Sequence, residues 1–198
     1  MGNDKFQNKY RIASARLPNW DYTSNGAYFI TICTKDRIPY FGRIENKKMI
    51  LSNMGIIADL MWHEIKNHAK NIELGEFVVM PDHIHGILIL NGGDGMGIAG
   101  NAIVETLHAT SLHHPRNPHL HRPRNHHPPS STSQMAKISP KSNSVSTIIR
   151  SYKSAVTKHG HRLGYPFEWQ TRFYDHIIRN AQEFENIKNY IANNPMNW

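Results

Sequence analysis

The chain has 198 residues and a formal net charge of +8, from 23 Lys and Arg against 15 Asp and Glu. This length fits one domain of about 100 to 200 residues, and the basic excess is typical of proteins that bind a polyanion such as nucleic acid. Cys33 is the single cysteine, which excludes an internal disulfide and a cysteine zinc cluster and favours a reducing cytoplasm. No run approaches the roughly 20 apolar residues of a membrane span, so we expect no membrane partner.

The N-terminal half opens with strand-forming residues followed by a helix. Residues 27–34, AYFITICT, are rich in β-branched and aromatic side chains and follow the turn-prone TSNG, so they predict a strand. Residues 42–52, GRIENKKMILS, predict a second strand with the polar character of a sheet edge. A helix over 53–69, capped by Ser52, is indicated by apolar residues at helical spacing: Ile56, Ile57, Leu60, Met61 and Ile65.

Two apolar strands then precede a change in composition. Residues 72–80 and 84–90 predict strands joined by a tight turn or bulge at the Pro-Asp pair between them. From 91 to 143, Gly, Pro, Ser and His dominate, and no apolar period is sustained. We therefore predict a flexible insertion within a single domain that spans 1–198, and a metal-binding or DNA-binding segment is the alternative.

Order is expected to return after the insertion. Residues 144–160 place their apolar side chains on one helical face, and Gly160 is the expected end of that helix. Residues 173–179, FYDHIIR, predict a strand. A last helix begins at Asn180, which has a glutamate three residues later as in a capping box, and it ends before Pro195.

The order of these elements indicates the fold class. Adjacent strands linked by short turns favour an antiparallel sheet. Strands on both sides of two helices, with a further helix at the end, predict an α+β fold of the split βαβ type. We therefore expect a ferredoxin-like sheet, the architecture also used by RNA-recognition domains, with helices packed on a face.

A histidine pair interrupts the most apolar predicted strand. Side chains alternate across a strand, so His83 and His85 point to the same face, with their Cα atoms about 6.6 Å apart. Two imidazoles held in this way by apolar neighbours can bind one cation. Two strand histidines with ordinary hydrogen bonds are the alternative interpretation.

Two segments of the chain resemble a known family. Residues 78–90, VVMPDHIHGILIL, are similar to the histidine-hydrophobic-histidine (HUH) segment of the single-tyrosine HUH transposases. The C-terminal FEWQTRFYDHIIRNAQEFENIKNYIANNPMNW resembles the REP-associated tyrosine transposases, whose members carry a similar WQ...DH.IRN...YI..NP pattern. The resemblance covers most of residues 20–90 and 144–198.

The resemblance implies an enzyme of DNA transposition and recombination that cleaves and rejoins strands through a 5′-phosphotyrosine intermediate. It implies that His83 and His85 bind a divalent metal, Mg²⁺ or Mn²⁺, and that Tyr190 is the nucleophile. It also implies a third metal ligand at Asn194, which stands four residues after the tyrosine, the spacing that shares one helix face. Packing beside neighbouring isoleucines is the alternative role for Tyr190, and the rival nucleophiles are Tyr152, Tyr165 and Tyr174.

The resemblance further implies single-stranded or hairpin DNA as the partner, in a prokaryotic cytoplasm in association with the nucleoid. A monomer and a homodimer both stay open. Trp169 is a candidate to stack on a base or to pack in the core, and the candidates for phosphate contacts are Arg150, Lys153, Arg172 and Arg179. The alternative function is a catalytically inactive nucleic-acid-binding module of the same ferredoxin-like fold.

Overall fold

The computed structural model describes residues 20–91 and 143–198, together with two short N-terminal strands. The insertion predicted at 91–143 lies almost wholly outside these residues, so it stays a prediction, as does the single domain predicted for 1–198. Within the described part, no helix is long and apolar enough to cross a membrane.

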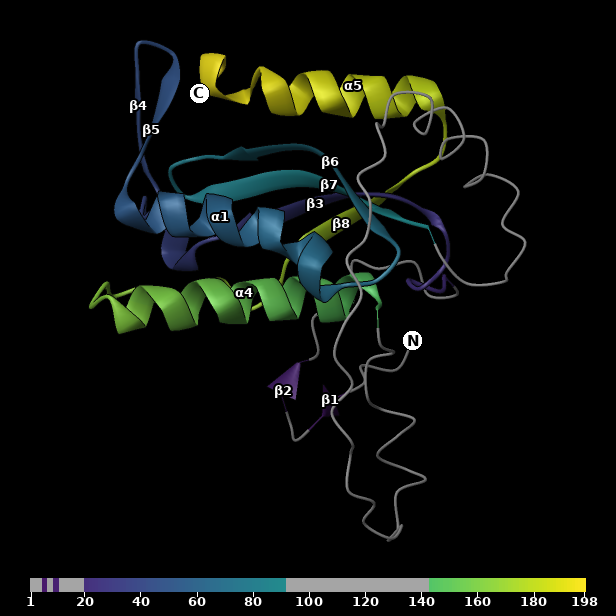
Figure 1. Cartoon of the computed structure of the whole chain (residues 1–198), viewed down its shortest axis with the longest axis horizontal. Helices are drawn as coiled ribbons and strands as arrows, with labels where there is room; N and C mark the ends of the chain where they lie inside the picture. Colours follow the sequence, from purple (N-terminus) through teal and green to yellow (C-terminus); the bar gives the residue numbers. More distant parts are fainter. Residues whose placement is uncertain (1–4, 7–8, 11–19, 92–142) are drawn as a thin grey trace, which may run out of the picture.

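A four-stranded antiparallel sheet in the order β6-β7-β3-β8 forms the centre of the structure (Figure 1). Its strands are β3 (Gly26–Cys33), β6 (Ile72–Val79), β7 (His83–Leu90) and β8 (Tyr174–Ile178). A helix follows β3 and another precedes β8, so neighbouring strands in the sheet are not all consecutive in the chain. This is the split βαβ arrangement, and the predicted ferredoxin-like α+β fold is confirmed.

Helices cover both faces of this sheet, as Figure 1 shows. Helices α1 (Asn53–His68) and α4 (Val145–Arg162) pack side by side on one face. Helix α5 (Ala181–Ala192) lies across the opposite face, and the short 3-10 helix η2 (Asn194–Met196) follows it. The sheet is therefore the middle layer of three.

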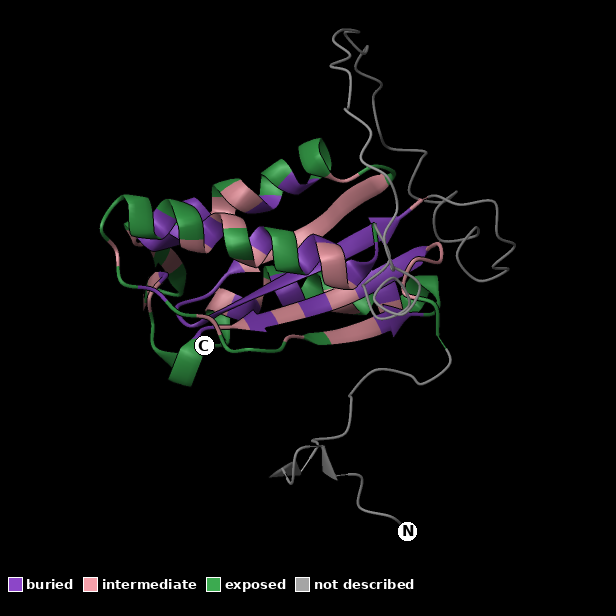
Figure 2. Cartoon of the chain, turned by 90° about the horizontal axis from the view of Figure 1, so that it is seen from below, coloured by how far each residue is buried: buried purple, intermediate pink, exposed green. Residues whose placement is uncertain are grey.

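Strand alternation divides the buried side chains into two clusters. The larger lies between the sheet and the paired helices α1 and α4, whose inner faces are buried and outer faces exposed (Figure 2). It includes Tyr28, Ile30, Ile32, Trp62, Ile84, Leu88 and Ile149. The smaller lies under α5 and comprises Ala27, Ile87, Ile89, Ile178, Phe184 and Ile191.

The helix starts follow the predicted caps. The Ser52 hydroxyl accepts the Gly55 N–H at 3.1 Å, as expected of an N-cap side chain. The predicted end at Gly160 is wrong, because α4 continues to Arg162. Gly160 is buried inside the helix, where an added Cβ would lie 2.7 Å from the Met54 sulfur. The glycine therefore serves close packing between α4 and α1, which a single sequence does not reveal.

The polar strand predicted over 42–52 is two strands. Strands β4 (Gly42–Glu45) and β5 (Lys48–Leu51) form a separate hairpin, whose turn residues Asn46 and Lys47 have φ values of 49° and 62°. Two consecutive left-handed residues are typical of a two-residue hairpin turn. A second pair of strands, β1 (Lys5–Phe6) and β2 (Lys9–Tyr10), is also separate from the main sheet.

The apolar spacing predicted for α1 is buried only in part. Ile57 and Ile65 lie in the main core, but Ile56 and Leu60 are exposed. The burial of this helix is set by the neighbouring α4 as well as by the sheet, so its apolar positions and its buried face do not coincide.

Candidate active site

The side chains of His83 and His85 converge on the α5 face of β7. In the sheet register His83 pairs with Cys33 and His85 pairs with Thr31. The two Nε2 atoms lie 3.0 Å apart, and both residues are buried, with 5% and 6% of their surface exposed. The prediction that both imidazoles share one face is confirmed.

Asp82 fixes the orientation of the first imidazole. The Asp82 Oδ1 lies 2.6 Å from the His83 Nδ1, and its Oδ2 lies 3.0 Å from the Arg37 Nε. A carboxylate paired with a guanidinium can only accept, so His83 donates from Nδ1 and keeps the lone pair of Nε2. That lone pair accepts the Nε2–H of His85 at 3.0 Å, so the Nδ1 of His85 is an acceptor.

Thr31 performs the corresponding task for the second imidazole. Its Oγ1 lies 2.9 Å from the Nδ1 of His85, across the β3-β7 pairing. Phe29, two residues earlier on β3, stacks on the same imidazole with ring centroids 5.3 Å apart. Both partners restrain the ring, and both leave its Nε2 directed at His83.

The electrostatics keep the imidazoles neutral. Burial lowers the pKa of His85 to about 3, with smaller contributions from His83 and from the Arg37 charge. Burial also lowers the pKa of His83, against the opposing effect of its hydrogen bond to Asp82. A neutral imidazole keeps one lone pair, and both Nε2 atoms can bind a metal if the His85 proton moves to Nδ1, where the Thr31 Oγ1 lies 2.9 Å away.

Tyr190 reaches the histidine pair from α5. Its hydroxyl oxygen lies 3.4 Å from the His85 Nε2, and the two ring centroids are 5.3 Å apart. The Asn180 side chain caps the start of α5 by accepting the Glu183 N–H at 2.8 Å. The Glu183 carboxylate in turn accepts the N–H of Arg179, one residue earlier than in a strict capping box. Its other oxygen lies 2.7 Å from the Nε2 of His176. These contacts hold α5 on the sheet and so position Tyr190.

Asn194 lies outside the helix that carries Tyr190. Helix α5 ends at Ala192, and Asn194 opens η2 together with Pro195. Tyr190 and Asn194 therefore do not belong to one α-helix, as the predicted spacing assumed. Asn194 is buried, and no hydrogen bond joins its side chain to either histidine within the described residues.

The rival tyrosines lie in different surroundings. Tyr152 is buried in the main core and donates its hydroxyl to the Ala58 carbonyl. Tyr165 binds the side chain of Asn53 at the start of α1. Tyr174 is exposed on the same face as Tyr190, in edge contact with Phe29. The structure therefore brings Tyr190 to the histidine pair and leaves two of the three rivals on the other side of the sheet.

The predicted DNA-contacting residues do not form one group. Arg150 and Lys153 belong to α4, on the face opposite α5, whereas Arg172 and Arg179 are exposed at either end of β8. Trp169 donates its indole N–H to the Lys153 carbonyl and packs against the ring of Phe167 at 4.7 Å. These contacts favour the packing role for Trp169.

Several residues of the site were not singled out in the sequence. They are Thr31, Phe29, Arg37, Asp82 and Trp198, whose ring lies 5.5 Å from that of His83. Asp82 alone carried a usable signal, because a carboxylate beside a metal-binding histidine is the usual orienting partner. Phe29 and Thr31 reach the site through strand pairing. Arg37 reaches it from the 3-10 helix after β3, and Trp198 from the residues that follow η2.

The donor set fits a divalent metal at an open site. Two neutral imidazoles converge, and each has its other nitrogen held by Asp82 or Thr31, the outer-shell pattern of metal-binding histidines. Among the described residues, no group of three or more His, Cys, Asp and Glu side chains is arranged to hold a metal. Any cation at the pair would therefore need further oxygen ligands from substrate, water or an amide.

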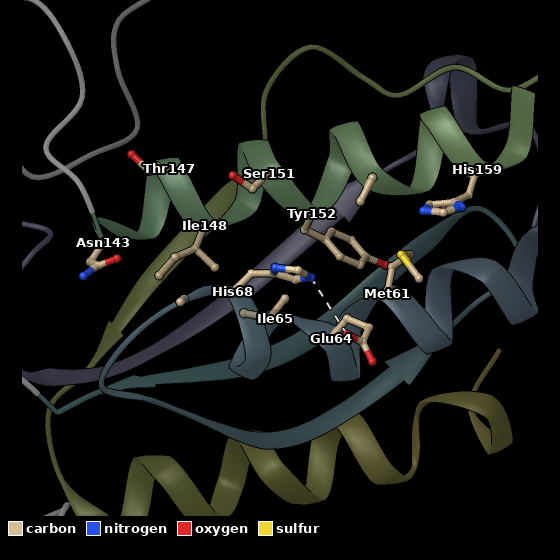
Figure 3. A pocket seen from close by; sticks show the side chains of 12 residues that line it. Met61, Glu64, Ile65, His68, Asn143, Thr147, Ile148, Ser151, Tyr152 and His159 are labelled. Atoms are coloured by element: carbon tan, nitrogen blue, oxygen red, sulfur yellow. Dashed lines mark ion pairs between the residues drawn. The ribbon is translucent and has the colours of Figure 1, made fainter. Parts of the chain in front are cut away.

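A separate hollow lies on the other side of the sheet. A groove of about 510 Å³ runs between α1 and α4 (Figure 3). Its wall and rim include Met61, Ile65, His68, Ile148, Tyr152 and His159. Neither histidine of the pair nor Tyr190 lines it, so it is distinct from the candidate active site.

Comparisons with known proteins place the chain as follows. An uncharacterised protein of Haemophilus influenzae is 33% identical over 187 residues, which cover 93% of this chain and 88% of that protein. A solved structure of a REP-associated tyrosine transposase bound to a REP hairpin superposes with a TM-score of 0.53 at 18% identity, covering 94% of this chain and 74% of that one. At this identity the likeness shows a shared fold. No family model matches the sequence.

Proposed function

The chain belongs to the family of the Haemophilus influenzae protein, and we propose that it is a metal-dependent enzyme that cleaves and rejoins single-stranded DNA. One observation carries the proposal: the hydroxyl of Tyr190 lies 3.4 Å from a buried imidazole whose Nε2 is 3.0 Å from a second. A nucleophile beside a cation site is the arrangement that phosphodiester cleavage requires. The residues that resemble the HUH and YI..NP motifs are the ones that meet there.

Single-stranded or hairpin DNA is the proposed substrate. The REP-associated transposase that shares this fold is bound to a REP hairpin. The chain itself carries a net charge of +8, which favours a polyanionic partner. The proposed phosphate contacts are Arg172, before the end of β8 that carries Tyr174, and Arg179, after its other end.

Tyr190 is the proposed nucleophile. Its oxygen forms a bond to phosphorus while the bond from phosphorus to the 3′ oxygen breaks, so the protein keeps the 5′ phosphate and a 3′ hydroxyl is released. The reverse attack by another 3′ hydroxyl breaks the bond to Tyr190 and joins the strands. The phosphodiester bond energy is retained in the phosphotyrosine, so rejoining needs no ATP.

His83 and His85 are the proposed metal ligands, and Asn194 is a further candidate that would have to turn toward them. A bound divalent cation would polarise the phosphate oxygens and offset their charge. Two imidazoles favour Mn²⁺ over Mg²⁺, which prefers oxygen ligands. With the His85 nitrogen bound to such a cation, the phenolic proton of Tyr190 would pass to solvent, which reaches its exposed side chain.

A covalent-adduct assay tests this proposal. The full chain is incubated with Mn²⁺ and a pool of hairpin oligonucleotides with randomised flanks, labelled at either the 3′ or the 5′ end. We expect the 3′ label in an SDS-resistant protein adduct and the 5′ label in a released fragment with a 3′ hydroxyl. EDTA and Tyr190→Phe should each abolish the adduct, whereas the matched control Tyr165→Phe, on the other side of the sheet, should retain it.

The opposite outcomes are equally clear. No adduct with any substrate would leave a catalytically inactive nucleic-acid-binding module as the better description. An adduct that persists in Tyr190→Phe would contradict the assignment of the nucleophile. An adduct bearing the 5′ label would contradict the proposed polarity of cleavage.

A further inference from the structure

A row of aromatic rings crosses the α5 face of the sheet at the candidate active site. Neighbouring rings lie close enough to interact, with centroids between 4.5 and 6.4 Å apart. In order along the row, the rings are those of Tyr174, Phe29, His85, His83 and Trp198. Three separate strands and the C-terminal residues contribute to it.

The two ends of the row differ from its centre. The central imidazoles are buried, but Tyr174 and Trp198 expose 51% and 56% of their surface. Exposed rings of this size gain little from packing, so the stability of the fold does not account for them. The rings of Tyr174 and Trp198 each contact one neighbouring ring of the row and leave part of their surface exposed to solvent.

Tyr190 stands over the middle of the row. Its ring lies 5.3 Å from that of His85 and 6.2 Å from that of Phe29. The exposed ring of Tyr174 is beyond Phe29, and that of Trp198 is beyond His83. A nucleotide chain whose phosphate lies at Tyr190 would therefore meet an exposed ring on either side.

We propose that Tyr174 and Trp198 are stacking positions for unpaired bases on the two sides of the phosphate that Tyr190 attacks. The inference rests on the proposed function for the position of that phosphate. Each stacked base contributes about 1 to 3 kcal/mol in proteins that bind single strands, with little dependence on sequence. Bases within a duplex are already stacked on one another and cannot use such rings, so the site selects unpaired nucleotides.

Each end of the row has an arginine in its neighbourhood. Arg172 is exposed two residues before Tyr174. At the other end, Arg37 pairs with Asp82, which binds the imidazole that Trp198 covers. The exposed guanidinium of Arg172, close in sequence to Tyr174, suits a chain that alternates phosphates with bases.

The test measures binding without reaction. The full chain carrying Tyr190→Phe is titrated in EDTA against a fluorescein-labelled oligothymidylate, and anisotropy reports the affinity. Trp198→Ala and Tyr174→Ala should each weaken binding by about fivefold or more, whereas Trp198→Phe should keep most of the affinity. Trp20→Ala is the matched control, because Trp20 is also exposed but binds the hydroxyl of Tyr28, a residue of the opposite face.

An abasic oligonucleotide of the same length separates stacking from a structural effect. On that backbone the two alanine variants should bind as well as their parent, because it offers no base to stack. Equal losses on both oligonucleotides, or no loss on oligothymidylate, would overturn the inference. Because this measurement needs neither metal nor nucleophile, its outcome is independent of the adduct assay.

Discussion

Along β7, the residues that face α1 and α4 differ in chemistry from those that face α5. Ile84 and Leu88 are wholly buried in the main core. On the other face, His83 and His85 lie at one end of the strand, and Ile87 follows them in the smaller apolar cluster under α5. The face toward α1 and α4 is apolar throughout. The face toward α5 is apolar near the start of that helix and polar near the end of that helix, where the two histidines lie.

This difference shows how a single strand separates stability from chemistry. Adjacent residues share a backbone but lie on opposite sides of the sheet. Substitutions on the α1 and α4 face should therefore lower the free energy of unfolding, and substitutions at the polar end of the α5 face should lower activity. The four predictions below test that separation.

The neighbouring pair Ile84 and His85 gives the largest contrast. His85→Ala should abolish the DNA adduct while lowering the free energy of unfolding by about 1 to 2 kcal/mol, the scale of its two lost side-chain hydrogen bonds. Ile84→Ala should lower it by about 2 to 5 kcal/mol through a core cavity and keep the adduct at temperatures where the protein is folded. Denaturant unfolding and the adduct assay check both; the separation fails if both variants lose stability equally.

Gly86 tests how tightly the apolar face is packed. A Cβ at this position would lie 2.3 Å from the Trp62 ring, which itself stacks on Phe77 at 4.6 Å. Gly86→Ala should therefore lower the free energy of unfolding by about 1 to 3 kcal/mol. Trp62→Phe in the same chain should recover part of that loss, a coupling that a double-mutant cycle measures. Simple additivity of the two changes would contradict the contact.

Asp82 tests the polar end. Asp82→Asn removes the charge that orients His83, and loss of such a partner typically lowers metal affinity by about 10- to 100-fold. Isothermal titration with Mn²⁺ measures the effect. The control Glu168→Gln removes an exposed carboxylate paired with Lys35 and should leave metal affinity unchanged. If Asp82→Asn and the parent bound Mn²⁺ equally well, Asp82 would have no role in supporting the metal site.

Glu183 gives the smallest effect and a pH dependence. Its hydrogen bonds to the Arg179 N–H and to His176 lower its pKa below the ordinary 4.5. The stabilisation is thus present above pH 4.5 and is lost as the pH falls through the lower folded-state pKa. Glu183→Gln should cost about 0.5 to 1 kcal/mol at neutral pH, and this difference should vanish in acid. Glu185→Gln on the same helix, an exposed residue paired with Lys188, should show no such change.

Local patterns were enough to predict most of the fold. The strands and helices that carry the site follow from alternation, helical spacing and the caps at Ser52 and Asn180, because these depend on neighbours in the chain. The end of α4 was predicted too early, because Gly160 allows close packing against Met54 of α1 and does not end the helix. The turn within the β4-β5 hairpin was missed, so its two strands, which form a sheet of their own, were predicted as one strand.

The sequence predicted that His83, His85 and Tyr190 lie together, but not which residues surround them. Alternation alone places His83 and His85 on one face, and the motif resemblance identifies Tyr190 as their partner. Thr31 and Trp198 reach the histidines through strand register and the turn after α5, which no local pattern encodes. Trp169 had two predicted roles, and its partly buried contacts with Phe167 and the Lys153 carbonyl favour packing.

Mapping the covalent attachment tests the central claim most directly. The adduct is digested with nuclease and trypsin, and mass spectrometry locates the peptide that carries the phosphonucleotide. The account predicts residues 189–198, where Tyr190 is the sole tyrosine. Attachment within 151–153, 163–172 or 173–179, the peptides of Tyr152, Tyr165 and Tyr174, would contradict it.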